Sequence, residues 1–367
     1  MQEIWWGKFL IPAAVAAAVS YLVTGWVVKW GKKLGIMDDP KAHIHPKVVH
    51  EKTVPRGGGW SIWAALALGV GIFAGDNFRL WGVMGGATIL ALTGFLDDRY
   101  AEKVSPYVRL ILNALAALCV IGVGIGIAYI SNPFGGIWHL DWPRWCLAVN
   151  GVNHCIWVWS DLFALVWLVW MQNSVGWSSG VDGQLSGFVI TAAVTMALLA
   201  MRFGTDAGQW PVLILAGITA GAYAGFLPWN WYPQKIMPGY GGKSLAGFLL
   251  GTLAILSAAK VGAMIMVLGL PMMDAVLVII KRLREGRSPV WGGREHLHHY
   301  LLDAGWSKKQ IAVFYWVISI ILAVLAWQLK APLKLFTMAA IALVAAGAIL
   351  WVKNWSTSLK QPGQDSG

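Results

Sequence analysis

The chain has 367 residues, of which 57% are hydrophobic and only 12% are charged, whereas a soluble domain averages about 25% charged residues. The mean hydropathy is +0.61 and apolar runs of membrane length recur from end to end, which excludes an ordinary soluble domain and predicts an integral membrane protein. The net charge is +11, but basic residues in a multi-spanning protein more often set its orientation in the bilayer, so we expect membrane lipid and no nucleic acid as a partner.

The apolar runs predict an all-α protein with about eleven transmembrane helices in one bundle. Shorter runs are included because a bundle tolerates them. The long run between 245 and 280 is divided at Lys260, since it is too long for one span. Residues 1–352 would form a single multi-spanning domain and residues 353–367 a short tail. The predicted spans are residues 10–28, 60–73, 80–96, 108–130, 156–171, 188–201, 211–226, 245–258, 261–280, 311–327 and 335–352.

The distribution of basic residues predicts the orientation. Segments that follow odd-numbered spans hold 21 of the 28 Lys and Arg residues. The positive-inside rule places these segments in the cytoplasm, with the N-terminus outside and the C-terminus inside the cell membrane. The polar clusters all fall on this side and therefore predict one composite cytoplasmic site; they are residues 43–59, 97–109, 172–187, 228–243 and 281–309.

Two adjacent acids, Asp97 and Asp98, directly follow the predicted span 80–96, where hydrocarbon gives way to water. Neighbouring carboxylates repel each other unless a cation or a divalent metal lies close by. A site that handles phosphate through a metal would supply that cation. A further acid, Asp274, lies near the middle of the ninth predicted span and could face either the bundle or the site.

Two glycine-containing loops allow two interpretations each. Consecutive glycines at 57–59 follow Lys47 and His50, and their N–H groups at a helix start could contact an anion; the same run could be a flexible turn. Asp182 is the only carboxylate in the loop after the fifth span. It could present its oxygens to a metal, or it could simply form an Asp-Gly turn with Gly183.

Two basic segments suggest contacts to phosphate or sugar. Lys243 ends a glycine-rich stretch that lacks the G-x-x-x-x-G-K-[ST] spacing, so a nucleoside triphosphatase is excluded, and Lys243 is a candidate phosphate partner. On a helix only His296 and His299 would share a face, and no third suitable ligand is in view, which disfavours a zinc site. Hydrogen bonding to a sugar or diphosphate suits His296, His298 and His299 better.

Taken in order, these motifs resemble those of the polyprenyl-phosphate N-acetylhexosamine-1-phosphate transferases, a family of the glycosyltransferase family 4 type, over nearly the whole chain. The His-Leu-His-His order at 296–299 is similar to the polysaccharide-initiating branch, which uses UDP-GlcNAc and undecaprenyl phosphate. The matching residues are His50 with 55–58, Asp97 with Asp98, Asn173 with Gly180, Asp182 and Gly183, Asn230 with Pro233 and Lys235, and 296–299.

The chain departs from the family pattern at four positions. Ser179 replaces the first Asp of an Asp-Gly-x-Asp pair, and Gly176 replaces the second Asn of an asparagine pair. In a Gly-Asp-x-Gly-Ser segment, Tyr240 replaces the Asp and Lys243 replaces the Ser. Asp97, Asp98 and Asp182 remain. Lys243 could supply part of the positive charge that a fully coordinated metal would give a diphosphate; the rival interpretation is that catalysis has been lost.

The resemblance implies that polyprenyl phosphate enters from the bilayer and attacks the sugar-linked phosphorus of a UDP-N-acetylhexosamine. UMP leaves, and a polyprenyl-diphospho-sugar remains for cell-envelope polysaccharide synthesis. Asp97 would deprotonate or orient the lipid phosphate, and Asp97, Asp98 and Asp182 would hold Mg²⁺, with Mn²⁺ as an alternative. A homodimer is expected from relatives. The resemblance also implies a catalytic role for His298 and substrate contacts from Lys47, His50, Asn173, Asn230, Lys235, Lys243, Arg294, His296 and His299.

Two other classes of protein compete with this interpretation. A catalytically silent relative would bind lipid phosphate or nucleotide sugar without turnover. A transporter would carry more charges within its spans than Asp274 and a detectable internal repeat, and the sequence shows neither.

A local pattern independent of the resemblance predicts a short outer β-hairpin at about 144–157. The Asn150-Gly151 pair is a strong signal for a two-residue turn and lies midway between Cys146 and Cys155. Counting outward from the turn places the two thiols opposite each other at a non-hydrogen-bonded position. A disulfide is permitted outside the cell; two unpaired cysteines are the alternative.

Overall fold

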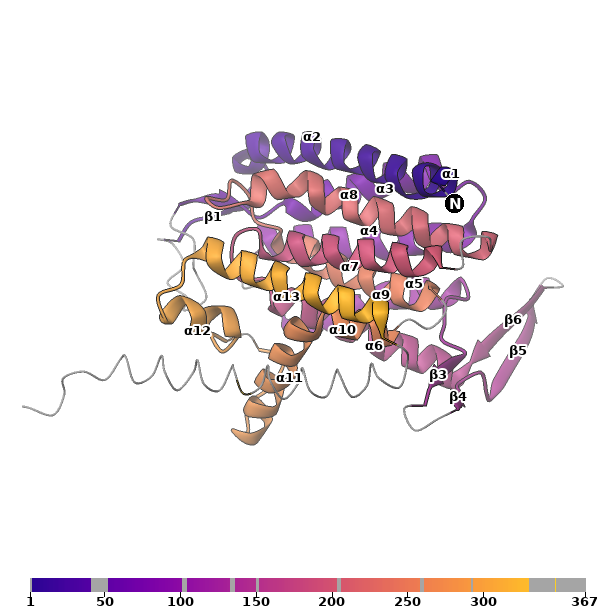
Figure 1. The fold of residues 1–367 in the computed structure, drawn as a ribbon. Coiled ribbons are helices and arrows are strands. Elements are labelled where there is room, and N and C mark those ends of the chain that lie inside the picture. Colours follow the sequence, from indigo (N-terminus) through magenta and orange to yellow (C-terminus); the bar gives the residue numbers. More distant parts are fainter. Residues whose placement is uncertain are drawn as a thin grey trace, which may run out of the picture.

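A computed structural model describes residues 2–40, 52–100, 104–132, 136–149, 152–202, 206–257, 261–291, 293–329 and 347. Outside these residues lie Lys47, His50, the predicted eleventh span at 335–352 apart from residue 347, and the tail at 353–367. The described part is a bundle of roughly parallel and antiparallel helices (Figure 1). Its helices are α1 (Gln2–Trp5), η1 (Trp6–Leu10), α2 (Ile11–Leu34), α3 (Gly58–Phe73), α4 (Phe78–Arg99), α5 (Pro106–Gly122), α6 (Val158–Trp177), α7 (Gln184–Met201), η2 (Ala207–Gln209), α8 (Trp210–Asn230), α9 (Gly239–Leu256), α10 (Val261–Val267), α11 (Gly269–Arg284), α12 (Leu297–Asp303) and α13 (Lys308–Gln328).

Five helical runs among the described residues are long and apolar enough to cross a membrane: Gln2–Leu34, α4, α7, α8 and α13. The pair α10 and α11 would make six, and α3 and α5 are shorter apolar helices. The multi-pass helical bundle is therefore confirmed. The number eleven is not confirmed and stays a prediction.

The ninth predicted span is wrong as a single helix. α10 and α11 are bent by 84° at Leu268, and Figure 1 shows α11 leaving the direction of the bundle. Pro271 has no N–H, and in a continuous helix its ring would clash with the carbonyl of Val267. Hydropathy alone does not register such a break, because the residues on both sides of it are apolar.

The buried helix α8 packs against α2, α3, α7 and α9. Three glycines spaced four residues apart on α8 meet the backbone of the first helical run. A Cβ atom at Gly217, Gly221 or Gly225 would lie 2.4, 2.0 or 2.0 Å from the carbonyl oxygens of Phe9, Ala13 and Ala17, respectively. Small residues at this spacing allow two membrane helices to approach closely.

Short antiparallel strand pairs lie at the two ends of the bundle (Figure 1). At the end that carries α12, β1 (Met37–Asp38) pairs with β2 (Val54–Pro55). At the other end β3 (Tyr129–Ser131) pairs with β4 (Ile137–His139), and β5 (Arg144–Val149) pairs with β6 (Val152–Trp157).

The predicted hairpin pairing is confirmed. Val149 pairs with Val152 and, three steps further out, Cys146 pairs with Cys155. These two cysteines form a disulfide with their Cα atoms 4.0 Å apart. That the hairpin lies outside the cell stays a prediction.

Candidate functional site

The acidic pair lies buried in the last turn of α4, where Asp97 and Asp98 are each 7% exposed. Arg109, in the first turn of α5, places its Nε 2.7 Å from Asp97 Oδ1. The backbone N–H of Tyr240, at the start of α9, donates to Asp98 Oδ1 at 3.0 Å. Asp98 is therefore held at the N-terminal end of α9, where the helix dipole favours negative charge, and Asp97 is paired with a basic side chain of α5.

Glycines bring the start of α9 against the acids. A Cβ atom at Gly94 of α4 would lie 2.3 Å from Gly241 Cα, and one at Gly59 of α3 would lie 2.9 Å from the same atom. The Gly58 N–H donates to the Met237 carbonyl at 3.1 Å. The Gly58 N–H is therefore engaged within the protein and is not available to an anion. Gly58 and Gly59 start α3 and pack it against the α9 segment, so they do not form a flexible turn.

The side chain of Tyr240 links three helices. Its hydroxyl donates to Asn113 Oδ1 on α5 at 2.9 Å, and its ring centroid lies 5.3 Å from the Arg109 guanidinium carbon. The Asn113 carbonyl accepts in turn from Gln172 Nε2 on α6 at 3.2 Å. At the position where the resemblance expects an acid, this chain therefore has an aromatic side chain that supports the counter-ion of Asp97.

The histidine segment is attached to α11 by Asp274, which is 1% exposed. Asp274 Oδ2 lies 2.9 Å from His296 Nδ1, and Oδ1 accepts from the Leu297 N–H at 2.8 Å. The rings of His296 and His298 stack at 5.8 Å, and His298 touches the loop after α6, because a Cβ atom at Gly180 would lie 1.9 Å from His298 Nε2.

His298 and His299 are neutral groups. Burial, followed by the charge of His299, lowers the pKa of His298 well below its usual value. Burial, followed by the positive charge of Arg294, lowers the pKa of His299 to about 4. The Nδ1 atoms of both rings are buried without a hydrogen-bond partner in the described part of the chain. Both imidazoles can therefore act as hydrogen-bonding groups but do not carry a charge near pH 7.

Lys243 acts electrostatically on both of these parts of the site, on Asp97 and Asp98 and also on His298 and His299. The acidic pair, Lys243 and the histidine segment therefore form one composite site at the end of the bundle that carries α12, on the left in Figure 1. Arg56, which pairs with Asp38 at 2.7 Å, also acts on both acids.

The loops that carry Asp182 and Asn230 hold each other. Asp182 Oδ2 accepts from the Gln234 N–H at 3.1 Å, and Asn230 Oδ1 accepts from the Gly183 N–H at 3.2 Å. The Asn230 amide donates to Gln234 Oε1 and to the Ile236 carbonyl, both at 3.0 Å. Asn230, predicted to contact substrate, is thus engaged within the protein by its oxygen and its nitrogen.

The predicted three-carboxylate metal site is not assembled. The described residues contain no group of three or more His, Cys, Asp or Glu side chains that could hold a metal ion, so Asp182 does not join Asp97 and Asp98 as a ready donor set. Mg²⁺ is often held by one or two carboxylates together with substrate phosphates and water. The pair Asp97 and Asp98 fits a metal of that kind, shared with a substrate.

Three other predicted residues have local partners. Asn173 donates to the Val169 carbonyl within α6 at 2.7 Å. Lys235 is exposed, with its Nζ 5.3 Å from the ring centroid of Trp229. Arg294 lies 2.6 Å from Asp303 of α12.

The sequence interpretation missed Arg109 and left Asp274 unassigned. A signal for Arg109 was present: a basic residue in the first turn of an apolar helix, after the helix-starting Ser105 and Pro106, needs a nearby anion or the interface. No local pattern pointed to the contact of Asp274 with His296, 22 residues away.

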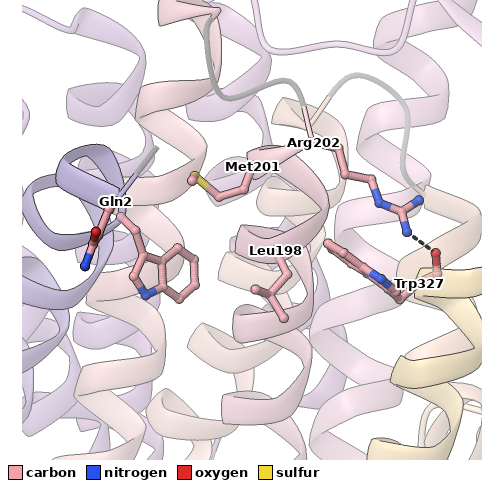
Figure 2. Close-up of a pocket in the computed structure, with 6 residues that line it drawn as sticks. Gln2, Leu198, Met201, Arg202 and Trp327 are labelled. Carbon is pink, nitrogen blue, oxygen red and sulfur yellow. Dashed lines mark hydrogen bonds between the residues drawn. The ribbon is translucent and has the colours of Figure 1, made fainter.

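A separate cavity of about 500 Å³ opens near the other end of the bundle and is not part of this site. Figure 2 shows that Gln2, Leu198 and Met201 line it with Arg202 and Trp327. The Arg202 guanidinium lies 4.0 Å from the Trp327 ring centroid and donates to the Trp327 carbonyl, so it caps the end of α13.

Over most of its length the chain is similar to several named transferases. The chain is 26% identical over 333 residues to a protein of Bacillus subtilis (strain 168) named "Probable undecaprenyl-phosphate N-acetylglucosaminyl 1-phosphate transferase", covering 88% of this chain and 85% of that protein. It is 27% identical over 335 residues to a "Decaprenyl-phosphate N-acetylglucosaminephosphotransferase" of Mycolicibacterium smegmatis, covering 82% and 78%. It is 25% identical over 308 residues to an "Undecaprenyl-phosphate alpha-N-acetylglucosaminyl 1-phosphate transferase" of Yersinia pestis, covering 80% and 76%.

The family model described as glycosyl transferase family 4 matches residues 80–258, a segment that begins just before the acidic pair in α4 and includes Asp182, Asn230 and Lys243. The histidine segment lies beyond this match, but the similarity to the named transferases covers most of the chain. The chain is thus similar to glycosyl transferase family 4 in the segment that carries the acidic pair and the glycine-rich start of α9, and to the named transferases along most of its length.

Proposed function

We propose that this protein transfers N-acetylglucosamine 1-phosphate from UDP-GlcNAc to a polyprenyl phosphate, releasing UMP. The observation that carries the proposal is the convergence of Asp97 and Asp98 with Lys243 and the histidine segment at one end of a membrane bundle. The names of the similar proteins supply the substrate class. The product would be a polyprenyl-diphospho-GlcNAc for a cell-envelope polysaccharide.

The geometry suits a transfer that depends on positioning and charge. Phosphoryl transfer requires little covalent work from the protein and much neutralisation of the charge on the phosphates. Lys243 and Arg109 supply positive charge next to the acids. Asp97 orients the attacking lipid phosphate through its partner Arg109, while neutral His298 and His299 offer hydrogen bonds to the sugar and diphosphate.

A divalent metal, Mg²⁺ or Mn²⁺, would be held by Asp98 with Asp97 and completed by phosphate oxygens. Bound there, it would neutralise negative charge on the diphosphate as the bond to UMP breaks. The Tyr240 N–H and the start of α9 fix the position of Asp98 before any metal is present. Asp182 would then hold the loop before α7, through Gln234, instead of ligating the metal.

The remaining predictions about the whole protein are part of this proposal. We place the site in the cytoplasm and the β5–β6 hairpin outside the cell membrane, on the basis of the Lys and Arg distribution. We keep eleven spans, because one predicted span lies outside the described residues and α3, α5, α6 and α9 are 16 to 20 residues long. The homodimer stays a prediction from relatives.

The test is UMP release by the purified protein given a polyprenyl phosphate and a panel of UDP-sugars, with Mg²⁺ and with EDTA. We expect metal-dependent release with UDP-GlcNAc, and at least a 100-fold loss in Asp97→Asn, because a removed transition-state charge contact costs about 3 kcal/mol. Release that is independent of metal and unaffected by Asp97→Asn would contradict the proposal.

One further variant distinguishes an active transferase from a catalytically silent relative. Tyr240→Asp restores the acid that the family pattern expects at this position. If the parent chain binds UDP-GlcNAc without releasing UMP and Tyr240→Asp gains release, the native protein binds its ligands without turnover. We expect the reverse: the parent chain is active and Tyr240→Asp loses activity, because the new carboxylate would remove the aromatic support of Arg109.

A further inference from the structure

We infer that Asp274 is a positioning residue for the transferase site, acting through His296. The inference rests on the proposed function and deepens it, because it assigns different roles to the three histidines. His296 has an acid partner, whereas no hydrogen bond from an acid to His298 or His299 is found among the described residues.

The contacts of Asp274 fix where the proton of His296 lies. A carboxylate 2.9 Å from Nδ1 accepts a hydrogen bond, so Nδ1 must carry hydrogen in either charge state of the ring. No hydrogen bond to His296 Nε2 exists within the described residues. The second nitrogen is therefore left for a ligand, as an acceptor when the ring is neutral and as a donor when it is charged.

Neighbouring rings also fix the orientation of the His296 ring plane. It lies parallel to His298, with 6° between the ring planes, and its centroid is 6.4 Å from that of Trp177 at the end of α6. The Leu297 N–H is held by the other oxygen of Asp274. One carboxylate therefore orients both the imidazole of His296 and the first turn of α12, which carries His298 and His299.

The position of Asp274 argues against a role in packing alone. It lies in the second turn of α11, after the bend at Leu268, and is 1% exposed within an apolar segment. Burying a carboxylate there costs free energy unless it is paired and hydrogen-bonded. An ionisable group in a membrane segment is by default a functional candidate. Its further contact is Ser178 Oγ at 3.4 Å, from the loop that precedes Asp182.

A double-mutant cycle tests the inference. Asp274→Asn keeps the size of the side chain but turns one acceptor into a donor, which forces His296 into the other tautomer. We expect kcat for UMP release to fall at least about 10- to 100-fold in Asp274→Asn, the loss seen when the hydrogen-bond partner that orients a metal-ligating histidine is changed. His296→Gln should lose a similar factor, and the double variant should be no worse than His296→Gln alone, because both changes remove the same function.

Two readouts separate this role from a structural one. Ser178→Ala removes the long contact to Asp274 and a hydrogen bond to the Pro271 carbonyl at 3.0 Å, but leaves His296 attached. We expect this variant to keep kcat within about twofold. The thermal midpoint of each variant is measured in the same detergent, and UDP-GlcNAc binding is measured by calorimetry. The inference would be overturned if the loss of kcat in the double variant equalled the product of the two single losses, or if Asp274→Asn were as active as the parent. Either result would leave the proposed function intact. A parent chain that neither binds nor consumes UDP-GlcNAc would overturn both.

Discussion

At the scale of single residues, Glu295 organises the basic loop before the histidine segment. Its carboxylate receives Lys281 Nζ at 2.6 Å, Arg282 Nε at 2.8 Å and Arg287 at 2.6 Å. Burial opposes ionisation of this carboxylate, but the hydrogen bonds from Lys281, Arg282 and Arg287 together outweigh that effect and lower the pKa of Glu295 to about 2. Three positive charges of the segment 281–287 are thus paired inside the loop.

Glu295→Gln should lower the free energy of unfolding by about 3 kcal/mol, because it leaves the buried Arg282 without its charged partner. Since the folded-state pKa is below the unfolded value, the stabilisation is complete above about pH 4.5 and is lost as pH falls toward 2. Thermal unfolding in detergent at pH 7 and pH 3 measures both effects. Glu285→Gln is the matched control, because Glu285 is 43% exposed and should change stability by less than about 1 kcal/mol.

His299 should make the stability of the folded protein sensitive to acid at a higher pH than Glu295 does. Its pKa is about 4 in the folded protein, below the usual 6.5, so the unfolded chain binds a proton that the folded chain does not. Stability should therefore fall as pH decreases from about 6.5 to 4, by up to about 1.4 kcal/mol per pH unit from this group. His299→Asn should flatten that part of the stability curve in thermal unfolding between pH 7 and pH 4.5. A variant whose slope equals that of the parent would show that His299 does not titrate this way.

At the scale of elements, the site depends on helices meeting backbone to backbone. The acids of α4 reach the N–H of Tyr240 only because glycines let α3, α4 and α9 come together. The sequence shows those glycines but does not show their partners, since Gly94 and Gly241 are far apart along the chain. By sequence, the glycine run at 57–59 is compatible with a phosphate contact or a flexible turn, and the structure gives Gly58 and Gly59 a packing role.

Gly94→Ala should destabilise the protein by about 1–3 kcal/mol and abolish most activity, because its Cβ atom would lie 2.3 Å from Gly241 Cα and push α9 away from Asp98. Gly85→Ala on the same helix is the control, since a Cβ atom at Gly85 meets nothing within 4 Å. Thermal midpoint and UMP release are measured for both. Equal behaviour of the two variants would mean that the close approach of α4 and α9 is unimportant.

At the scale of the whole molecule, function depends on which side of the membrane each end of the helix bundle faces. The composite site and the β5–β6 hairpin lie at opposite ends of the bundle (Figure 1). If the disulfide Cys146–Cys155 forms in cells, its end of the bundle faces an oxidising compartment, and the site then faces the cytoplasm, where UDP-sugars are made.

Labelling of cysteines in intact cells measures this orientation. In a Cys119→Ser background, a membrane-impermeant maleimide should label the protein only after an impermeant reductant has been added, because both remaining thiols are bonded. Cys155→Ser in the same background should be labelled without reduction, since Cys146 is then free and exposed. Labelling that requires cell lysis would place the hairpin, and not the site, in the cytoplasm.

The sequence by itself determined the membrane class, the family resemblance, the hairpin register and most of the residues that meet at the site. These are local properties: hydropathy, motif order and the two-residue turn are each encoded in one short stretch. Only the tertiary structure decided which of those residues are free to act. It paired Asp97 with Arg109, engaged Asn230 within its own loop, left Asp182 apart from the acidic pair and attached His296 to Asp274. The physical reason is that such partners come from distant segments, and helix packing and the bend at Leu268, rather than local sequence, bring them within hydrogen-bonding distance.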